Sequence, residues 1–559
     1  MKVFFSIIFF ASLISFFNLS FAKENSVQID SIDSIYYNAK IWTGVEGDNS
    51  NQAIAITNGK IVAIGNNTEI KKLKTARTVL INLEGSRVTP GFIDSHTHFI
   101  LAGLRLGEIQ LREVKSREAF IEKIKQKTDS LPKGTWILGG SWDHELWGGD
   151  LPNKSWIDAV SPDHPVYLMR HAGHMTFANS LALKLAGIDK STPDPTGGEI
   201  ERDDEGNPTG IMKEAAKALI EKVIPPTPHH ELDAAFERSQ ALALSLGVTQ
   251  IHNVYNWESF ETFLRARDRG ALKMRVYSLT DIKNWQQMAN YISINGKGDD
   301  NLRWGGVKGY VDGALGASTA WFYQPYTDEP ETSGYPRHDT ADIRKWILQA
   351  DKAGLQVVVH GIGDKANDWL LDTFEEVAQQ NGLRDRRFRI EHAQHLSPEA
   401  FPRFNKLGVI ASMQPYHAID DGRWAEKRIG SERIKTAYAF RSLLDNNAHV
   451  TFGSDWFVAP LNPMTGIQAA VTRQTLDGNH PDGWVPEQKI TVKEALSAYT
   501  SQAAYAGFQE NKLGTLAVGK LADFLVLSDD ILSVDTDNIA DIKVIRTVIA
   551  GKEQFILHE

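Results

Sequence analysis

The chain has 559 residues, which is too long for one small core and ample for a large barrel with an accessory domain. Its 42% hydrophobic and 23% charged residues are typical of a soluble globular enzyme. The net charge of −10 comes from 60 basic and 70 acidic side chains, without a long basic run. This balance excludes nucleic acid and anionic membranes as expected partners and leaves a small-molecule substrate.

The first residues form a segment of their own. Met1 and Lys2 precede an apolar run over residues 3–17, and Asn18-Leu19-Ser20-Phe21-Ala22 follows, with small residues at the positions that a signal peptidase reads. This pattern predicts a secretory signal peptide, residues 1–22, that is cleaved after Ala22. An uncleaved membrane anchor is the alternative, but a bilayer requires about 20 apolar residues and no later segment is long enough. We therefore expect a secreted or periplasmic protein without stable membrane insertion after cleavage.

The sequence contains no cysteine. This excludes disulfides, thiolate metal ligands and a cysteine nucleophile. An exported chain of this kind must be stabilised by its packed core.

Two β-rich segments lie at opposite ends of the chain. Residues 27–88 alternate apolar and polar positions, and the pair Asn58-Gly59 between two such runs is a strong hairpin signal. The same alternation returns in residues 510–559. We expect both ends to assemble into one discontinuous β-sandwich domain.

The middle of the chain, residues 89–509, alternates short apolar strands with amphipathic helices. Two of the helical patterns are closed by Gly354 and Gly382, as is usual at helix C-termini. Eight strands are expected, within residues 87–99, 248–252, 274–278, 306–311, 356–360, 388–392, 409–413 and 450–455. Eight strands alternating with helices predict an α/β fold, the (β/α)8 TIM barrel.

The connection from the first barrel strand to the second, about residues 101–247, is unusually long. A structureless loop of this length is implausible, and the segment has turn signals and aromatic residues of its own. We interpret it as an inserted subdomain that lies over the barrel mouth. A helix over residues 230–246 would return the chain to the second strand.

The first barrel strand carries His96 and His98 at its far end. Side chains two positions apart in a strand point to the same face, so both imidazoles can bind one ion. Imidazole is the commonest protein ligand for zinc and related ions. Surface or core histidines satisfied by hydrogen bonds are the alternative for such a pair taken alone.

Other polar side chains recur at the ends of the predicted strands, where the active sites of this barrel lie. Two have plain alternatives, because His360 and His392 could be buried imidazoles bonded to the backbone. Asp455 could instead cap a following helix. One shared metal site explains all of these placements at once. The predicted set is His96 and His98 on the first strand, Lys308 on the fourth, His360 on the fifth, His392 on the sixth and Asp455 on the eighth.

Lys308 poses a separate problem, because an unpaired ammonium inside a barrel is costly and two cations beside it would repel it. The problem disappears if the amine has a lowered pKa and has reacted with carbon dioxide. The resulting carbamate could bridge two metal ions with its oxygens. A structural salt bridge, for instance with Asp312, is the alternative.

Several motifs resemble the metal-dependent amidohydrolase superfamily: Phe-Ile-Asp-Ser-His-Thr-His at 92–98, the lysine on strand four, the histidines on strands five and six, Gly453-Ser454-Asp455 and the closing residues 514–524. The long insertion is similar to amidohydrolase family 3, the branch that includes the N-substituted formamide deformylases, in residues 140–143, 170–174 and 208–210. One position departs from that branch, since Ala172-Gly173-His174 stands where Asp-Gly-His is frequent.

The resemblance implies a site with two divalent metal ions. One ion would be held by His96, His98 and Asp455, the other by His360 and His392, with carbamylated Lys308 between them. Zinc is the default from the nitrogen and oxygen ligands. Asp455 would act as general base and then as general acid. Trp142, His174 and His417 are candidate substrate contacts, because each is expected in a loop near the mouth.

The predicted function is that of an exported metal-dependent hydrolase. It would cleave a C–N bond of the amide or formamide type, outside peptide bonds, by attack of a metal-activated hydroxide. The same site could instead act on a lactone or another ester, or work as a mononuclear deaminase with unmodified Lys308. A binding protein that has lost its chemistry is the remote alternative. The sequence leaves a homodimer open.

Overall fold

A computed structural model of the protein describes residues 31–47, 50–170 and 175–558, so the predicted signal peptide lies outside the described residues. Eight parallel strands form one sheet in the order β20-β19-β18-β17-β16-β15-β14-β7, which curls into a nearly closed barrel. The strands are β7 (Phe92–Thr97), β14 (Val248–Val254), β15 (Arg275–Asp281), β16 (Leu302–Tyr310), β17 (Gln356–Gly361), β18 (Arg389–His392), β19 (Ile410–Met413) and β20 (His449–Phe452). The predicted TIM barrel is confirmed.

Helices cover the outside of the barrel. In α9 the side chain of Asp339 caps the N-terminus, Ile343 and Ile347 are buried one turn apart, and Gly354 follows with a φ of +77°. None of the helices within the described residues is long and apolar enough to cross a membrane. The helices are α7 (Trp257–Asp268), α8 (Trp285–Asn295), α9 (Thr340–Lys352), α10 (Asp364–Asn381), α11 (Phe401–Leu407), α12 (Pro415–Asp421), α13 (Ala425–Arg433), α14 (Phe440–Asp445), α15 (Pro463–Thr472), α16 (Val492–Ala498) and α17 (Ser501–Ala506).

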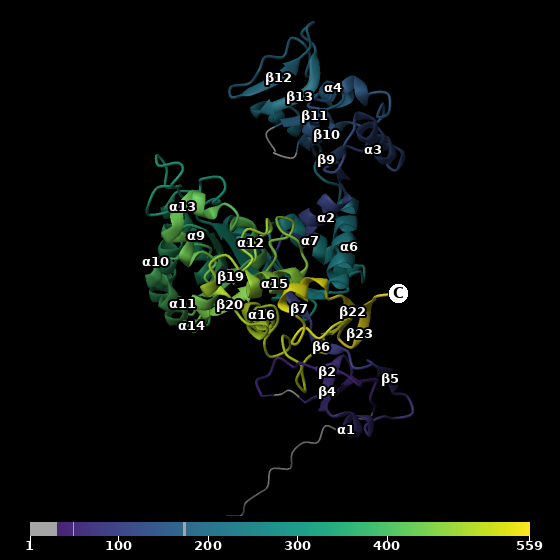
Figure 1. The fold of residues 1–559 in the computed structure, drawn as a ribbon, viewed down its shortest axis with the longest axis vertical. Coiled ribbons are helices and arrows are strands. Elements are labelled where there is room, and N and C mark those ends of the chain that lie inside the picture. Colours follow the sequence, from purple (N-terminus) through teal and green to yellow (C-terminus); the bar gives the residue numbers. More distant parts are fainter. Residues whose placement is uncertain (1–30, 48–49, 171–174, 559) are drawn as a thin grey trace, which may run out of the picture.

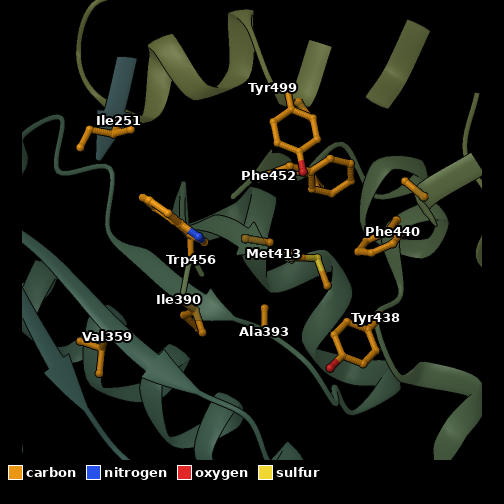
Figure 2. Close-up of a cluster of buried hydrophobic side chains, with 14 of the residues drawn as sticks. Ile251, Val359, Ile390, Ala393, Met413, Tyr438, Phe440, Phe452, Trp456 and Tyr499 are labelled. Atoms are coloured by element: carbon orange, nitrogen blue, oxygen red, sulfur yellow. The ribbon is translucent and has the colours of Figure 1, made fainter. Parts of the chain in front are cut away.

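Apolar and polar side chains along the barrel strands point to opposite faces of the sheet. Ile251, Val359 and Ile390 belong to the main apolar core, part of which Figure 2 shows. Their neighbours Arg389 and Glu391 point into the barrel, where both are fully buried. The barrel interior near the strand ends is therefore polar, and the apolar core lies outside it.

The two chain ends pack together, as predicted. A ring contact of 4.9 Å between Tyr36 and Phe524 joins residues from opposite ends in one buried cluster. One sheet has the order β4-β3-β1-β5 and the other β2-β6-β21-β22-β23. Their strands are β1 (Ser34–Tyr37), β2 (Lys40–Ile41), β3 (Ala53–Thr57), β4 (Lys60–Gly65), β5 (Val79–Asn82), β6 (Arg87–Pro90), β21 (Phe524–Leu527), β22 (Val544–Ile549) and β23 (Lys552–Ile556), with the short helix α1 (Asn67–Lys71) after β4.

The first strand expected from the sequence is divided between two domains. Its first half is β6 of the sandwich, and its second half is β7 of the barrel, with Gly91 between them. A Cβ atom at Gly91 would overlap the side chain of Thr249 in β14. Glycine at this position thus allows the sandwich strand to continue directly into the barrel.

We expect Gly91→Ala to lower the free energy of unfolding by about 1–3 kcal/mol, because the added methyl group must displace Thr249. Urea unfolding of the mature protein measures this. Gly65→Ala is the matched control, since its nearest neighbours would lie 3.6 Å from the new Cβ atom and little change is expected. Equal stability of the two variants would contradict the prediction.

The long insertion forms a subdomain with a six-stranded sheet and its own apolar clusters. The sheet has the order β12-β13-β11-β10-β9-β8, with β8 (Ile109–Gln110), β9 (Ile137–Trp142), β10 (Val166–Arg170), β11 (Met175–Ala178), β12 (Gly198–Arg202) and β13 (Pro208–Glu214). Its helices are α3 (Arg117–Asp129), α4 (Ser180–Leu185) and α5 (Ala218–Glu221). Figure 1 shows the subdomain standing beyond the barrel, connected through α2 (Phe99–Gly107) and α6 (His229–Ser245). The returning helix α6 agrees with the expectation for residues 230–246. That the subdomain covers the barrel mouth stays a prediction.

Candidate metal centre

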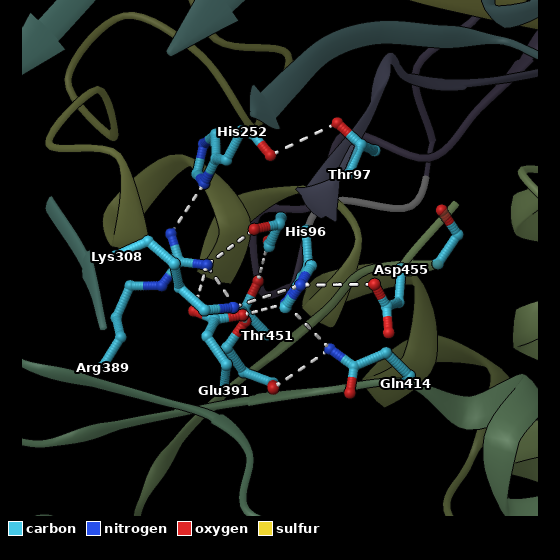
Figure 3. A network of polar contacts seen from close by, with 12 residues as sticks. His96, Thr97, His252, Lys308, Arg389, Glu391, Gln414, Thr451 and Asp455 are labelled. Atoms are coloured by element: carbon cyan, nitrogen blue, oxygen red, sulfur yellow. Dashed lines mark hydrogen bonds and ion pairs between the residues drawn. The ribbon is translucent and has the colours of Figure 1, made fainter. Parts of the chain in front are cut away.

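The predicted ligands meet at the ends of the barrel strands. His96 contributes to two close ring pairs, with His98 at 5.6 Å and with His392 at 5.2 Å between ring centroids. The ring of His360 lies 4.5 Å from that of His392. Figure 3 shows His96 with Lys308 and Asp455 around it. Six side chains from the ends of five barrel strands thus line one cup.

One side of the cup has three candidate ligand atoms close together. Oδ1 of Asp455 lies 3.1 Å from Nε2 of His98 and 3.4 Å from Nε2 of His96. One ligand atom from each of the three residues lies within 4.8 Å of the other two, and no helix follows for Asp455 to cap until α15. Two imidazole nitrogens and one carboxylate oxygen form a donor set that suits a divalent transition metal.

Asp455 is held by backbone contacts between the first and last barrel strands. Its N–H donates to the carbonyl of His96 at 2.8 Å, and the N–H of Ser454 donates to Asp94 at 3.0 Å. The backbone of Asp455 itself is left-handed, with a φ of +58°. Such backbone strain is typical of functional sites, and here it turns the carboxylate toward the histidines.

The other side of the cup contains His360 and His392. Nε2 of His360 donates to the carbonyl of Gly313 at 2.8 Å, which leaves Nδ1 as the nitrogen with a free lone pair. Burial, with Lys308 nearby, lowers the pKa of His360 to about 3. Burial and Lys308 likewise lower the pKa of His96 to about 4. Neutral imidazoles are the form that binds metals.

Lys308 is only 1% exposed, and its amine lies 3.4 Å from Nε2 of His96. Burial lowers its pKa to about 8, although Glu391 and Asp455 act in the opposite direction. Among the described residues, Lys308 forms no salt bridge with Asp312. Asp312 instead accepts N–H donors from Trp321 and from the backbone at the end of β17. Lys308 is therefore a buried amine that faces the cup.

The sequence analysis missed Glu391, which orients His96. Nδ1 of His96 pairs with this fully buried carboxylate, and that contact directs Nε2 into the cup. Arg389 lies 2.6 Å from Glu391, and the hydroxyl of Ser412 donates to it at 2.9 Å. Burial would raise the pKa of Glu391, but Arg389 and His96 lower it to about 2. The only available signal was its place directly before His392.

The cup fits a divalent metal because two of its polar atoms, one on each side, have no hydrogen-bond partner. Nδ1 of His392 and Oδ1 of Asp455 are buried without a hydrogen bond among the described residues. Buried polar atoms are nearly always paired in proteins, and clusters of orphans call for an explanation. A bound cation would satisfy ligand atoms on both sides of the cup.

Comparisons with known proteins agree with this site. The model of the Amidohydrolase family matches residues 79–555. The chain belongs to the amidohydrolase family. It is 39% identical to the protein LONG AFTER FAR-RED 3 of Arabidopsis thaliana, over 94% of this chain and 91% of that protein. It is also 27% identical to N-substituted formamide deformylase of Arthrobacter pascens, over 93% of this chain and 97% of that protein.

Among solved structures, an uncharacterized metal-dependent hydrolase from Pyrococcus furiosus is similar to this amidohydrolase. The TM-score is 0.75 at 30% identity, over 89% of this chain and 100% of that one. The resemblance that the motifs indicated is confirmed. Together with the candidate ligands of the cup, these comparisons identify a metal-dependent hydrolase of the amidohydrolase family.

The three candidate substrate contacts of this amidohydrolase have different positions. Trp142 is fully buried in the core of the inserted subdomain, where its indole N–H donates to the carbonyl of Leu168 at 3.0 Å. The structure therefore does not bring Trp142 to the cup. His174 lies outside the described residues. His417, on α12, is at the cup, with its ring 6.1 Å from that of His392.

Proposed function

We propose that this amidohydrolase cleaves a C–N bond of an amide or formamide, outside peptide bonds, in a small molecule. The observation that carries the proposal is the cup in which Asp455 lies beside His96 and His98, with ligand atoms left unpartnered. The similarity to N-substituted formamide deformylase supports a formamide-like substrate. A carboxylate beside a metal site can move a proton during hydrolysis, which this reaction requires.

The residues of the cup have separate roles in the proposed reaction. Two divalent ions in the cup, with zinc as the first choice, would lower the pKa of a water molecule toward neutrality and polarise a carbonyl group. His96 and His98 would hold one ion, and His360 and His392 the other. Asp455 would accept the proton of the attacking water at its carboxylate and pass it to the leaving nitrogen. The depressed pKa of Asp455, which the neighbouring histidines maintain against burial, keeps this carboxylate ionised before the reaction.

Lys308 is proposed to carry a carbamate whose oxygens would help to hold the divalent ions. Its buried amine has a lowered pKa, so an unprotonated fraction is available near neutral pH to react with carbon dioxide. The nitrogen attacks the carbon of carbon dioxide and loses one proton to solvent, which leaves a negatively charged group in the cup. This change of charge removes the repulsion between an ammonium and two metal ions.

Metal analysis tests the bridged site. Mature protein, from residue 23 onward, is prepared with bicarbonate and without chelator, and its metal content is measured. We expect two equivalents per chain, and Lys308→Ala is expected to reduce this number. One equivalent that does not depend on Lys308 would instead support a mononuclear site with an unmodified lysine.

A substrate panel tests the reaction. Amides and N-substituted formamides are compared with lactones, phosphoesters and amino-substituted heterocycles of similar size. Turnover of the amides or formamides is expected to exceed that of the other classes. Preferential turnover of a lactone or phosphoester, or release of ammonia from a heterocycle, would contradict the proposed bond. Absence of both turnover and bound metal would favour the inactive binding protein.

The proposed site of action is outside the cytoplasm, in the periplasm or the medium, because of the signal-peptide pattern in residues 1–22. Cell fractionation of the full-length protein tests this proposal. A mature N-terminus at Lys23 in the exported fraction is expected. Uncleaved protein in the cytoplasm or the membrane would contradict it.

A further inference from the structure

His417 is a partly buried histidine at the cup that has no role in the proposed mechanism. It lies in α12, after the seventh barrel strand, whereas the other histidines of the cup come from the first, fifth and sixth strands. Its ring is nearly parallel to that of His392, at an interplanar angle of 12°. Nε2 of His417 lies 4.0 Å from Oδ2 of Asp455, and the side chain is only 13% exposed.

The Nε2 atom of His417 has no hydrogen-bond partner among the described residues, although it is fully buried. Nδ1 of His392 is buried without a partner as well. Leaving such atoms unpaired in the folded protein costs free energy, and both belong to residues grouped with Asp455. Imidazole nitrogens with free lone pairs are what a transition metal binds.

A second three-residue group in the cup includes His417. One ligand atom each from His392, His417 and Asp455 lies within 4.8 Å of the others. Asp455 is shared with the first group, because Oδ1 faces His96 and His98 while Oδ2 faces His417. The two oxygens of one carboxylate thus point toward two separate sets of histidines.

We infer that His417 is a protein ligand of the second divalent ion, together with His392 and Asp455. Two imidazole nitrogens and a carboxylate oxygen select a borderline transition metal such as Zn²⁺ or Co²⁺ over Mg²⁺ or Ca²⁺. This adds a ligand from α12, the helix after the seventh strand, to those that the sequence motifs indicated. The inference concerns the metal centre and does not depend on which bond the enzyme cleaves.

The competing role for His417 is a contact with the substrate, which was the expectation from its place near the mouth. A substrate contact would leave the affinity for metal unchanged. Metal binding in the absence of substrate therefore separates the two roles. Zn²⁺ and Co²⁺ are the probes, and competition with a chelator gives the dissociation constant of each bound ion.

The experiment compares His417→Ala and His417→Gln with the wild-type mature chain. We expect both variants to keep one tightly bound ion and to bind the second at least about tenfold more weakly. With Co²⁺, the visible absorption of the second equivalent should shift or disappear. His395→Ala is the matched control, because His395 is 2% exposed and also has an unpartnered Nδ1, but belongs to neither ligand group. It should bind both ions as the wild type does.

Two equivalents bound by His417→Ala and His417→Gln with unchanged affinity would overturn the inference. Loss of both ions would overturn it as well, since it would show that His417 supports the whole centre and not the second ion. A single equivalent bound by the wild-type protein would contradict the inference, because there would be no second ion for His417 to bind. Thermal unfolding of each variant without metal shows whether a weaker affinity comes from a damaged fold. If His417→Ala does not fold, His417→Gln is used, because it retains a polar side chain of similar length.

Discussion

Changing Glu391 to alanine is expected to weaken metal binding and to destabilise the protein. Without the carboxylate, Nδ1 of His96 loses the contact that orients the ring, and such supporting contacts typically change metal affinity by about 10–100-fold. The guanidinium of Arg389, which is fully buried and 2.6 Å from Glu391, loses its acidic partner. A buried charge left without its partner costs about 3–5 kcal/mol in the free energy of unfolding.

Urea unfolding and zinc titration of Glu391→Ala measure these two effects separately. Glu375→Ala is the control, because Glu375 also pairs with an arginine, Arg403, but its side chain is 35% exposed and the pair contributes about 1 kcal/mol or less. Glu391→Gln should fall between the wild type and Glu391→Ala, since the amide can still accept a hydrogen bond from His96. If Glu391→Ala binds zinc and unfolds like Glu375→Ala, the carboxylate has no role in orienting His96.

The barrel could be predicted because its strands are marked by local features of the sequence. Short apolar runs such as 356–360 and 409–413 are separated by helical patterns, and the structure has strands at both places. The metal-binding positions followed from one rule, that the active site lies where parallel strands end. That rule needs no knowledge of which side chains touch.

Glu391 could not be found in the same way, because its partner His96 is 295 residues away in the sequence. Strand alternation would also send Glu391 and His392 to opposite faces. In the structure His392 has a left-handed backbone with a φ of +73°, which ends the alternation so that both residues reach His96. A local sequence pattern does not predict that change in backbone direction at His392.

Trp142 was a candidate substrate contact because it was expected in a loop near the mouth. In the structure it packs against Trp147 and bonds Leu168 within the subdomain. The subdomain is large enough to need a core of its own, and its aromatic residues supply it. Composition showed that the insertion would fold, whereas the direction of its aromatic side chains depended on contacts within its own sheet.

Changing Asp455 to asparagine is expected to abolish turnover while zinc stays bound. The asparagine oxygen can still serve as a ligand beside His96 and His98, but the amide cannot accept the proton of the attacking water. Loss of a general acid–base group typically lowers kcat by about 10²–10⁴-fold. Steady-state kinetics on the best substrate of the panel, with metal analysis of the same sample, measure both quantities.

Asp421→Asn is the matched control for Asp455→Asn. Asp421 is a partly buried carboxylate on the same helix as His417, but it accepts hydrogen bonds from Tyr438 at 2.6 Å and Gln394 at 2.9 Å and belongs to neither candidate ligand group. Its substitution should change kcat by less than tenfold. A near-normal rate of the Asp455→Asn protein would show that Asp455 does not take part in the proton transfer. Loss of zinc in parallel with the rate would assign this residue to metal binding alone, and the proton would then have to leave the cup by another group.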